Sequence, residues 1–171
     1  MYKNTPNPKN TAGKITALIS LIIGAALFGL SYTNMIKPAW LSQIFGLILV
    51  AVAIYIASVY LLRRYTFIIE VSDTDTSAAD FIITEQKNNR DITVCRIGVD
   101  EIISTRVVTP QNKKTVAEER KSMKRYSYNT QFAPNRQIEI VAEYEDEKLS
   151  IIVTYDENLL NILNSHIKNR V

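Results

Sequence analysis

The dominant feature of this sequence is a long apolar stretch near its N-terminus, in which residues 15–62 include one charged side chain, Lys37. All other lysines, arginines, aspartates and glutamates of the 171-residue chain lie outside it. Two uncharged runs, 15–32 and 39–62, flank the short connection that contains Lys37. As helices they would measure roughly 27 and 36 Å, against a hydrocarbon core of about 30 Å. The sequence therefore predicts a transmembrane helical hairpin over residues 15–62.

Cations beside the two predicted spans indicate how the hairpin is oriented. Lysines precede the first span and arginines follow the second, whereas the connection holds a single lysine: Lys3, Lys9 and Lys14, then Arg63 and Arg64, against Lys37. Because cytoplasmic flanks carry the excess of Lys and Arg, we expect both termini in the cytoplasm. Aromatic and basic residues near the span ends are expected to anchor the hairpin at the membrane interface: Tyr32, Trp40, Tyr60, Arg63 and Arg64. Residues 1–14, with two prolines and few apolar side chains, are expected to be a disordered cytoplasmic tail.

Small residues recur four positions apart in both spans, at Ser20 and Gly24, Ala25 and Gly29, Ser42 and Gly46, and Ala53 and Ala57. This spacing lets helix backbones approach closely, either within the hairpin or between membrane proteins. Neither span contains an acidic residue, a basic residue or a histidine, which a transport pathway would usually need. The small residues favour packing within the hairpin, and the lack of ionisable residues argues against a pore or a transporter.

Residues 63–171 are expected to form one small cytoplasmic domain. Short runs rich in β-branched and aromatic residues alternate there with polar turns, which is typical of an antiparallel sheet. Seven such runs lie at 65–71, 80–86, 92–97, 101–108, 125–130, 137–144 and 149–154. Thr154 and Glu157 fit a capping box, and apolar residues at helical spacing follow them. The predicted fold class is an α+β domain, a seven-stranded bent antiparallel sheet or barrel with a C-terminal helix.

Seven strands followed by one helix is the element order of the pleckstrin-homology (PH) superfold. The segments RRYTFIIE, FIITEQKNNRDITVCRI and TYDENLLNILNSHI resemble those of small bacterial membrane proteins that join a helical hairpin to a PH-like domain. The resemblance covers roughly residues 15–171. It implies a PH-like fold and a non-enzymatic role at a bacterial plasma (inner) membrane. The loop at 72–80 departs from phosphoinositide-binding PH domains, because it holds three acids and no base, so inositol-lipid recognition is not carried over.

Composition argues against several classes of protein. One histidine and one cysteine cannot build a structural zinc site or a disulfide framework, and five scattered glycines leave no glycine-rich phosphate loop. A net charge of +3 is too small to indicate nucleic acid as a partner. Cys95 is interpreted as a structural cysteine, His166 as a helix residue, and the acidic run at 143–147 as a solvated hairpin turn. We therefore expect no enzyme, no cofactor, no metal and no small-molecule substrate.

A basic segment between the fourth and fifth predicted strands is the candidate binding site. It contains six cations, Lys113, Lys114, Arg120, Lys121, Lys124 and Arg125, against two acids. One interpretation is a solvated or partly helical loop, and the other is contact with anionic lipid or an acidic protein surface. The leading prediction is a membrane-anchored binding module that holds a partner protein, or a second copy, near the bilayer. The alternative is a sensor of anionic membrane lipid through residues 113–125.

Overall fold

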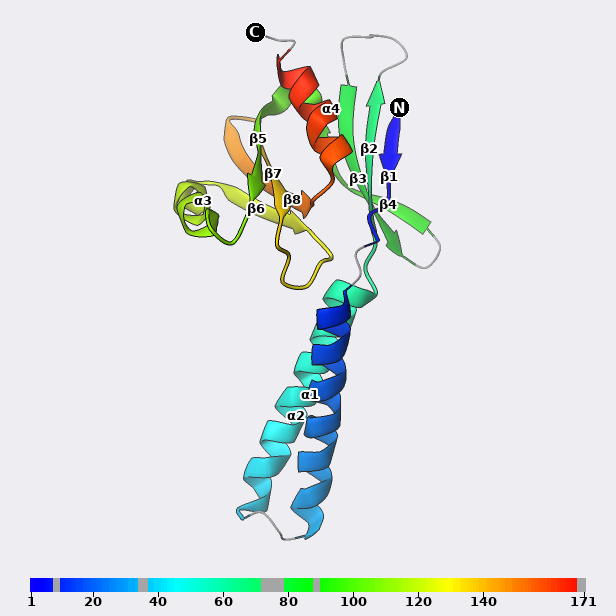
Figure 1. Cartoon of the computed structure of the whole chain (residues 1–171), viewed down its shortest axis with the longest axis vertical. Coiled ribbons are helices and arrows are strands. Elements are labelled where there is room, and N and C mark those ends of the chain that lie inside the picture. The colour runs from blue at the N-terminus through cyan, green and yellow to red at the C-terminus, as the bar shows by residue number, and fades with distance from the viewer. Residues whose placement is uncertain (8–9, 34–36, 72–78, 88–89, 169–171) are drawn as a thin grey trace. The chain divides into compact units, whose positions relative to one another are not determined.

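The structure is a computed structural model that describes residues 1–7, 10–33, 37–71, 79–87 and 90–168. The chain divides into two compact units (Figure 1). The helical unit comprises Pro8–Arg63 and Gln131–Ala133, and the β unit comprises Met1–Asn7, Arg64–Thr130 and Pro134–Val171. Two long apolar helices thus come early in the chain, and two sheets and a C-terminal helix follow. Asp73 and Asp75 of the expected acidic loop, and the basic residue Arg170, lie outside the described residues.

Two apolar helices make up most of the helical unit. Helix α1 (Thr11–Leu30) ends in a 3-10 turn, η1 (Ser31–Thr33), and α2 (Ala39–Ile56) continues into a π-helical turn, η2 (Ala57–Leu61). Each continuous stretch has 23 residues. At a rise of 1.5 Å per residue each measures about 34 Å, enough to cross a hydrocarbon core. The observed helices agree with the predicted spans, except that α1 begins earlier, at Thr11.

The two helices approach most closely where two glycines face each other. A Cβ atom added to Gly24 would lie 2.8 Å from the carbonyl oxygen of Gly46, and the reverse distance is also 2.8 Å. Neither position has room for a side chain, so the predicted close packing within the hairpin is confirmed here. Gly29 differs, because a Cβ atom there would meet nothing within 4 Å.

The outer surface of the hairpin is apolar. Leu18 is 58% exposed and Ile54 is 60% exposed, and most other large apolar side chains of both helices are exposed as well. The core helix of a soluble protein would bury such side chains. The hydroxyls of Ser31 and Ser42 donate to carbonyl oxygens of their own helices, at 2.6 and 2.8 Å, and so need no water. The outward faces of the two helices are thus suited to a hydrocarbon environment.

The first sheet of the β unit contains strands from before and after the hairpin. Strands β2 (Tyr65–Val71), β3 (Ala79–Lys87) and β4 (Arg90–Gly98) are antiparallel neighbours, and β1 (Tyr2–Asn4) pairs antiparallel with β2. The Tyr2 hydroxyl donates to Asp156 Oδ2 at 2.7 Å, and the Asn4 side-chain amide donates to the same oxygen. The expectation of a disordered tail is therefore wrong for residues 2–4, because β2 offers them an edge to pair with.

The second sheet has the strand order β5-β7-β8-β6. Its strands are β5 (Ile102–Val108), β6 (Lys124–Tyr128), β7 (Gln137–Tyr144) and β8 (Glu147–Thr154). Strand β6 lies parallel to β8, whereas the other neighbours are antiparallel. All seven predicted strand regions are strands, but they form two open sheets and no closed barrel. The segment between β5 and β6 carries the chain to the far side of β8, so these two strands cannot pair as a hairpin.

The main core lies between the two sheets, where helix α4 (Glu157–Lys168) also packs (Figure 1). Leu159 and Leu163 of α4 are fully buried there, which confirms the predicted amphipathic helix. The N-cap is Asp156 and not Thr154: Asp156 Oδ1 accepts the backbone N–H groups of Asn158 and Leu159 at 2.9 and 3.3 Å. Thr154 still belongs to β8, so the chain turns into the helix two residues later than predicted.

The acidic run at 143–147 is the β7–β8 hairpin, as predicted. Glu145 and Asp146 form its two-residue turn, with φ of 50° and 63°. Positive φ at both central residues is the signature of a type I′ turn, whose twist matches that of the flanking strands.

Candidate functional site

The predicted basic segment runs through a short helix, a 3-10 turn and the start of a strand. These elements are α3 (Lys113–Glu119), η4 (Arg120–Ser122) and the first residues of β6. Five of the six predicted contact residues are exposed: Lys113, Lys114, Lys121, Lys124 and Arg125. We call these five residues the basic surface. One of them, Lys124, forms an ion pair with Glu147 on β8.

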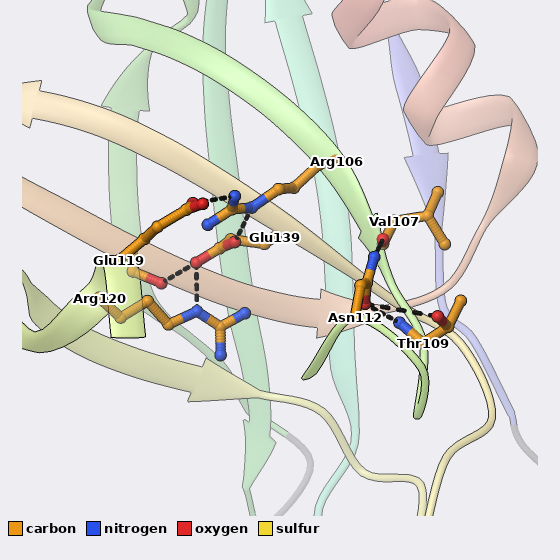
Figure 2. A network of polar contacts seen from close by, with 8 residues as sticks. Arg106, Val107, Thr109, Asn112, Glu119, Arg120 and Glu139 are labelled. Carbon is orange, nitrogen blue, oxygen red and sulfur yellow. Dashed lines mark hydrogen bonds and ion pairs between the residues drawn. The ribbon is translucent and has the colours of Figure 1, made fainter. Parts of the chain in front are cut away.

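The sixth cation, Arg120, is buried, with 7% of its surface exposed. Its Nε atom donates to Oε1 of Glu139, a fully buried residue of β7 (Figure 2). The predicted surface contact of Arg120 with lipid or a partner is therefore wrong. The side chain turns toward the sheet because a buried carboxylate there requires a counter-charge.

Glu139 has two further donors. Arg106 on β5 donates from Nε to Glu139 Oε2, and the Ser150 hydroxyl on β8 donates to Oε1 at 2.6 Å. Arg106 also donates from Nη1 to Glu119, at the end of α3 (Figure 2). We call Arg106, Glu119, Arg120 and Glu139 the ionic cluster. Its two positive and two negative charges balance, which offsets the large cost of burying ionised groups.

The protonation state of Glu139 follows from opposing effects. Burial raises the pKa of this carboxyl, but hydrogen bonds from Arg120, Ser150 and Arg106 outweigh burial and hold the pKa below its ordinary value. Glu139 is therefore ionised at neutral pH. The ionic cluster therefore contains a buried, charged carboxylate that is paired with Arg106 and Arg120.

A polar turn positions the start of α3. Asn112 accepts the backbone N–H of Thr109 at 2.7 Å and donates to the carbonyl oxygen of Val107 at 2.9 Å (Figure 2). Val116 of α3 is buried. The turn and the ionic cluster together hold α3 and η4 against the face of the second sheet that is turned away from α4 (Figure 1). The arrangement therefore presents Lys113, Lys114 and Lys121 on elements that are attached to the second sheet.

A concave feature lies between strands β4 and β6. It is a hollow of about 270 Å³, lined by residues of β4, β6, β7 and β8. The hydroxyl of Tyr128 on β6 reaches across and donates to the carbonyl oxygen of Val94 on β4 at 3.2 Å. Cys95 also lines the hollow, and burial raises the pKa of its thiol to about 11, so the thiol stays protonated at neutral pH. Within the described residues, no three His, Cys, Asp or Glu side chains are grouped so that they could hold a metal ion.

The predicted membrane-interface residues fall into two groups. Tyr32 and Trp40, near the connection between the helices, are 69% and 60% exposed. Arg63 and Arg64 are exposed as well. Tyr60 instead packs edge-to-face against Phe132 within the helical unit, with ring centroids 5.3 Å apart. The backbone N–H of Phe132 donates to Asn10 at 3.1 Å, so Tyr60 belongs to a small packed group at that end of the hairpin.

The sequence interpretation missed Arg106 and Glu139. Alternation along β7 puts Ile138 and Ile140 in the main core, which suggests that Glu139 faces solvent. The available signal in the sequence was weak: Val141 and Ile152 are apolar residues on the otherwise polar face that carries Glu139, and the structure buries both of them. A strand with apolar residues on both faces is covered on both faces, so a carboxylate within it needs partners.

The chain was compared with protein-family models, with curated proteins and with solved structures, and it matches none of them.

Proposed function

We propose that this protein is a membrane-anchored, non-enzymatic binding module. In this proposal the hairpin crosses a bacterial plasma membrane, and the β unit at the cytoplasmic face binds a partner protein or a second copy. The observation that carries the topology of this proposal is the pairing of β1 with β2. These strands precede and follow the hairpin, so a hairpin in the membrane must return both of its ends to the same side.

The exposed apolar surface of α1 and α2 supports the membrane anchor. Transferring such side chains out of water is favourable by roughly 25 cal/mol per Å² of apolar surface. The cytoplasmic orientation is supported by the excess of Lys and Arg beside the ends of the hairpin that join the β unit.

We further propose that the β unit is a variant of the PH-like fold. The proposal is supported by two sheets that enclose a C-terminal helix, with Leu159 and Leu163 in their shared core. The additional strand β1 and the parallel β6–β8 pair are departures from the seven-stranded antiparallel arrangement.

Fractionation and a reporter fusion test the proposal together. The full chain, expressed in bacteria, should remain in the membrane pellet after alkaline carbonate extraction and dissolve in detergent. A reporter that folds only in the cytoplasm, fused after Val171, should give signal. Release by carbonate would refute the anchor, and a silent but stably expressed fusion would refute the orientation.

A second candidate function, recognition of anionic lipid, is favoured by the basic surface and by the attachment of α3 and η4 to the second sheet. Each cation near an anionic leaflet contributes about 1 kcal/mol, so the basic surface would orient an anchored domain and not recruit it. In the full chain reconstituted into nanodiscs, a spin label at Ser122 should approach the lipid headgroups when anionic lipid replaces neutral lipid. The shift should vanish at high salt and after charge reversal of Lys113, Lys114 and Lys121. An unchanged label environment would reject lipid recognition.

A further inference from the structure

In each sheet, one side is extended or contacted by another element of the fold, and the other side is open. Strand β1 pairs along β2, and α4 contacts β5, where the Thr105 hydroxyl donates to Asn164 Oδ1 at 2.6 Å. Within the described part of the chain, β4 and β6 each have a strand neighbour on one side only. Such edges present unpaired N–H and C=O groups to an incoming strand. The outer edge of the three-residue strand β1 is open as well, but β4 and β6 are the open edges that border the hollow.

The hollow between these edges is lined mainly by apolar and aromatic side chains, with Arg96 as the one charged residue among the described residues that line it. Ile97, Leu149 and Ile151 contribute to its lining, together with Tyr126 and Tyr128. The bond from Tyr128 to the Val94 carbonyl shows that a backbone group of β4 points into the hollow. A volume of about 270 Å³ is enough for one or two large side chains but lies below the usual size of a small-molecule pocket.

Two of the lining residues are also exposed: Tyr126 on β6 is 44% exposed and Tyr144 on β7 is 46% exposed. On β4, Ile92 is 48% exposed and lies two residues before Val94, which lines the hollow. An apolar area beside unpaired strand edges is typical of a site that accepts an extended peptide.

The charges on the two framing strands specify the peptide further. Strands β4 and β6 carry four cations and one acid: Arg90, Arg96, Lys124 and Arg125, against Asp91. Arg96 is bound to Asp80, and Lys124 to Glu147. Arg90 and Arg125 form no ion pair with any residue that the structure describes. The strands therefore offer positive charge to an acidic ligand at two separate positions.

We propose that the groove between β4 and β6 binds an extended segment of a partner protein in which apolar and acidic side chains alternate. The peptide backbone pairs with the open edge of β4, and apolar side chains on one face enter the hollow. Acidic side chains on the other face meet Arg90 and Arg125, because successive residues of a strand point to opposite faces. This inference rests on the proposed binding function and gives it a site and a ligand chemistry.

A peptide selection tests the groove directly. Random ten-residue peptides displayed on phage are selected on the full chain in neutral nanodiscs, and enriched peptides are synthesised. They should alternate apolar and acidic residues, and their Kd should rise about tenfold in the Arg90→Glu/Arg125→Glu variant and in Tyr126→Asp. Ile103→Asp is the matched control, because Ile103 is an exposed apolar residue of β5, 47% exposed, and its replacement should leave the Kd unchanged.

N-methylation of the peptide separates strand pairing from other binding modes without altering the protein. Methylating the amides of one alternate set of residues should abolish binding, and methylating the other set should not, because only one set faces β4. Equal effects of both sets, or no shared pattern among the selected peptides, would overturn the proposal. The proposal would also be overturned if the protein forms a dimer that dissociates in the Tyr126→Asp variant, since a second copy would then be the occupant of the groove. If carbonate-resistant, folded protein selects no peptide, the groove proposal fails while the membrane anchor stands.

Discussion

Arg120 has a different role from the cations near it in the sequence. Lys121 and the other cations of the basic surface are exposed, whereas Arg120 is buried against Glu139. Composition alone cannot distinguish Arg120 from Lys121, since both are cations in the same segment. The difference depends on Glu139 and Arg106, which lie in other strands and meet Arg120 only in the folded protein.

Removing the Arg120 side chain should therefore destabilise the second sheet. Arg120→Met leaves Glu139 buried with Arg106 and Ser150 as its remaining partners, and we expect a loss of about 3 kcal/mol. Hydrogen exchange of β7 and β8 in the full chain measures this loss as faster exchange. Lys121→Met is the control and should change stability by no more than about 0.5 kcal/mol. Equal effects of the two replacements would mean that the ionic cluster does not hold the segment.

The lowered pKa of Glu139 predicts a pH dependence of the same sheet. A carboxyl whose folded pKa lies below its unfolded pKa contributes its full stabilisation above about pH 4.3, the ordinary value for glutamate. The contribution is lost as the pH falls from there through the lowered folded pKa. Urea unfolding of the β unit between pH 6 and pH 3 should show this loss, and Glu139→Gln should make the dependence less steep. A slope unchanged by Glu139→Gln would contradict the assignment.

At the scale of elements, the sequence predicts the secondary structure of each segment better than it predicts which strands pair. The seven strand regions and the C-terminal helix follow from local alternation and helical spacing. Strand β1 and the parallel position of β6 depend instead on partners that are distant in the chain. A three-residue strand such as Tyr2–Asn4 carries too little periodicity to be distinguished from a tail.

The hairpin provides an element-scale test with a matched control. Gly24→Val should force α1 and α2 apart, because its Cβ would lie 2.8 Å from a backbone oxygen of α2. We expect a loss of about 1–3 kcal/mol, seen as a lower melting temperature in detergent by far-UV circular dichroism. Gly29→Val places the same side chain in open space on the same helix and should melt close to the parent. Similar melting of both variants would show that the Gly24–Gly46 contact does not hold the helices together.

At the scale of the whole molecule, the β unit is assembled from both ends of the hairpin. A soluble protein that joins residues 1–7 to residues 64–171 through a flexible linker should be more stable than residues 64–171 alone. The expected difference is about 2 kcal/mol, because Tyr2 and Asn4 donate hydrogen bonds to the Asp156 carboxylate. Urea unfolding of both proteins measures it, and equal midpoints would mean that β1 is dispensable.

In the proposed topology the chain crosses the membrane twice and returns both ends to one side. Single cysteines at Lys3, Lys37 and Lys148, each in a Cys95→Ser background, test it with a membrane-impermeant maleimide on intact spheroplasts. We predict that the cysteine at position 37 is labelled from outside. Those at positions 3 and 148 should be labelled only after permeabilisation. Labelling of positions 3 and 148 from opposite sides of the membrane would contradict the pairing of β1 with β2 and the topology inferred from that pairing.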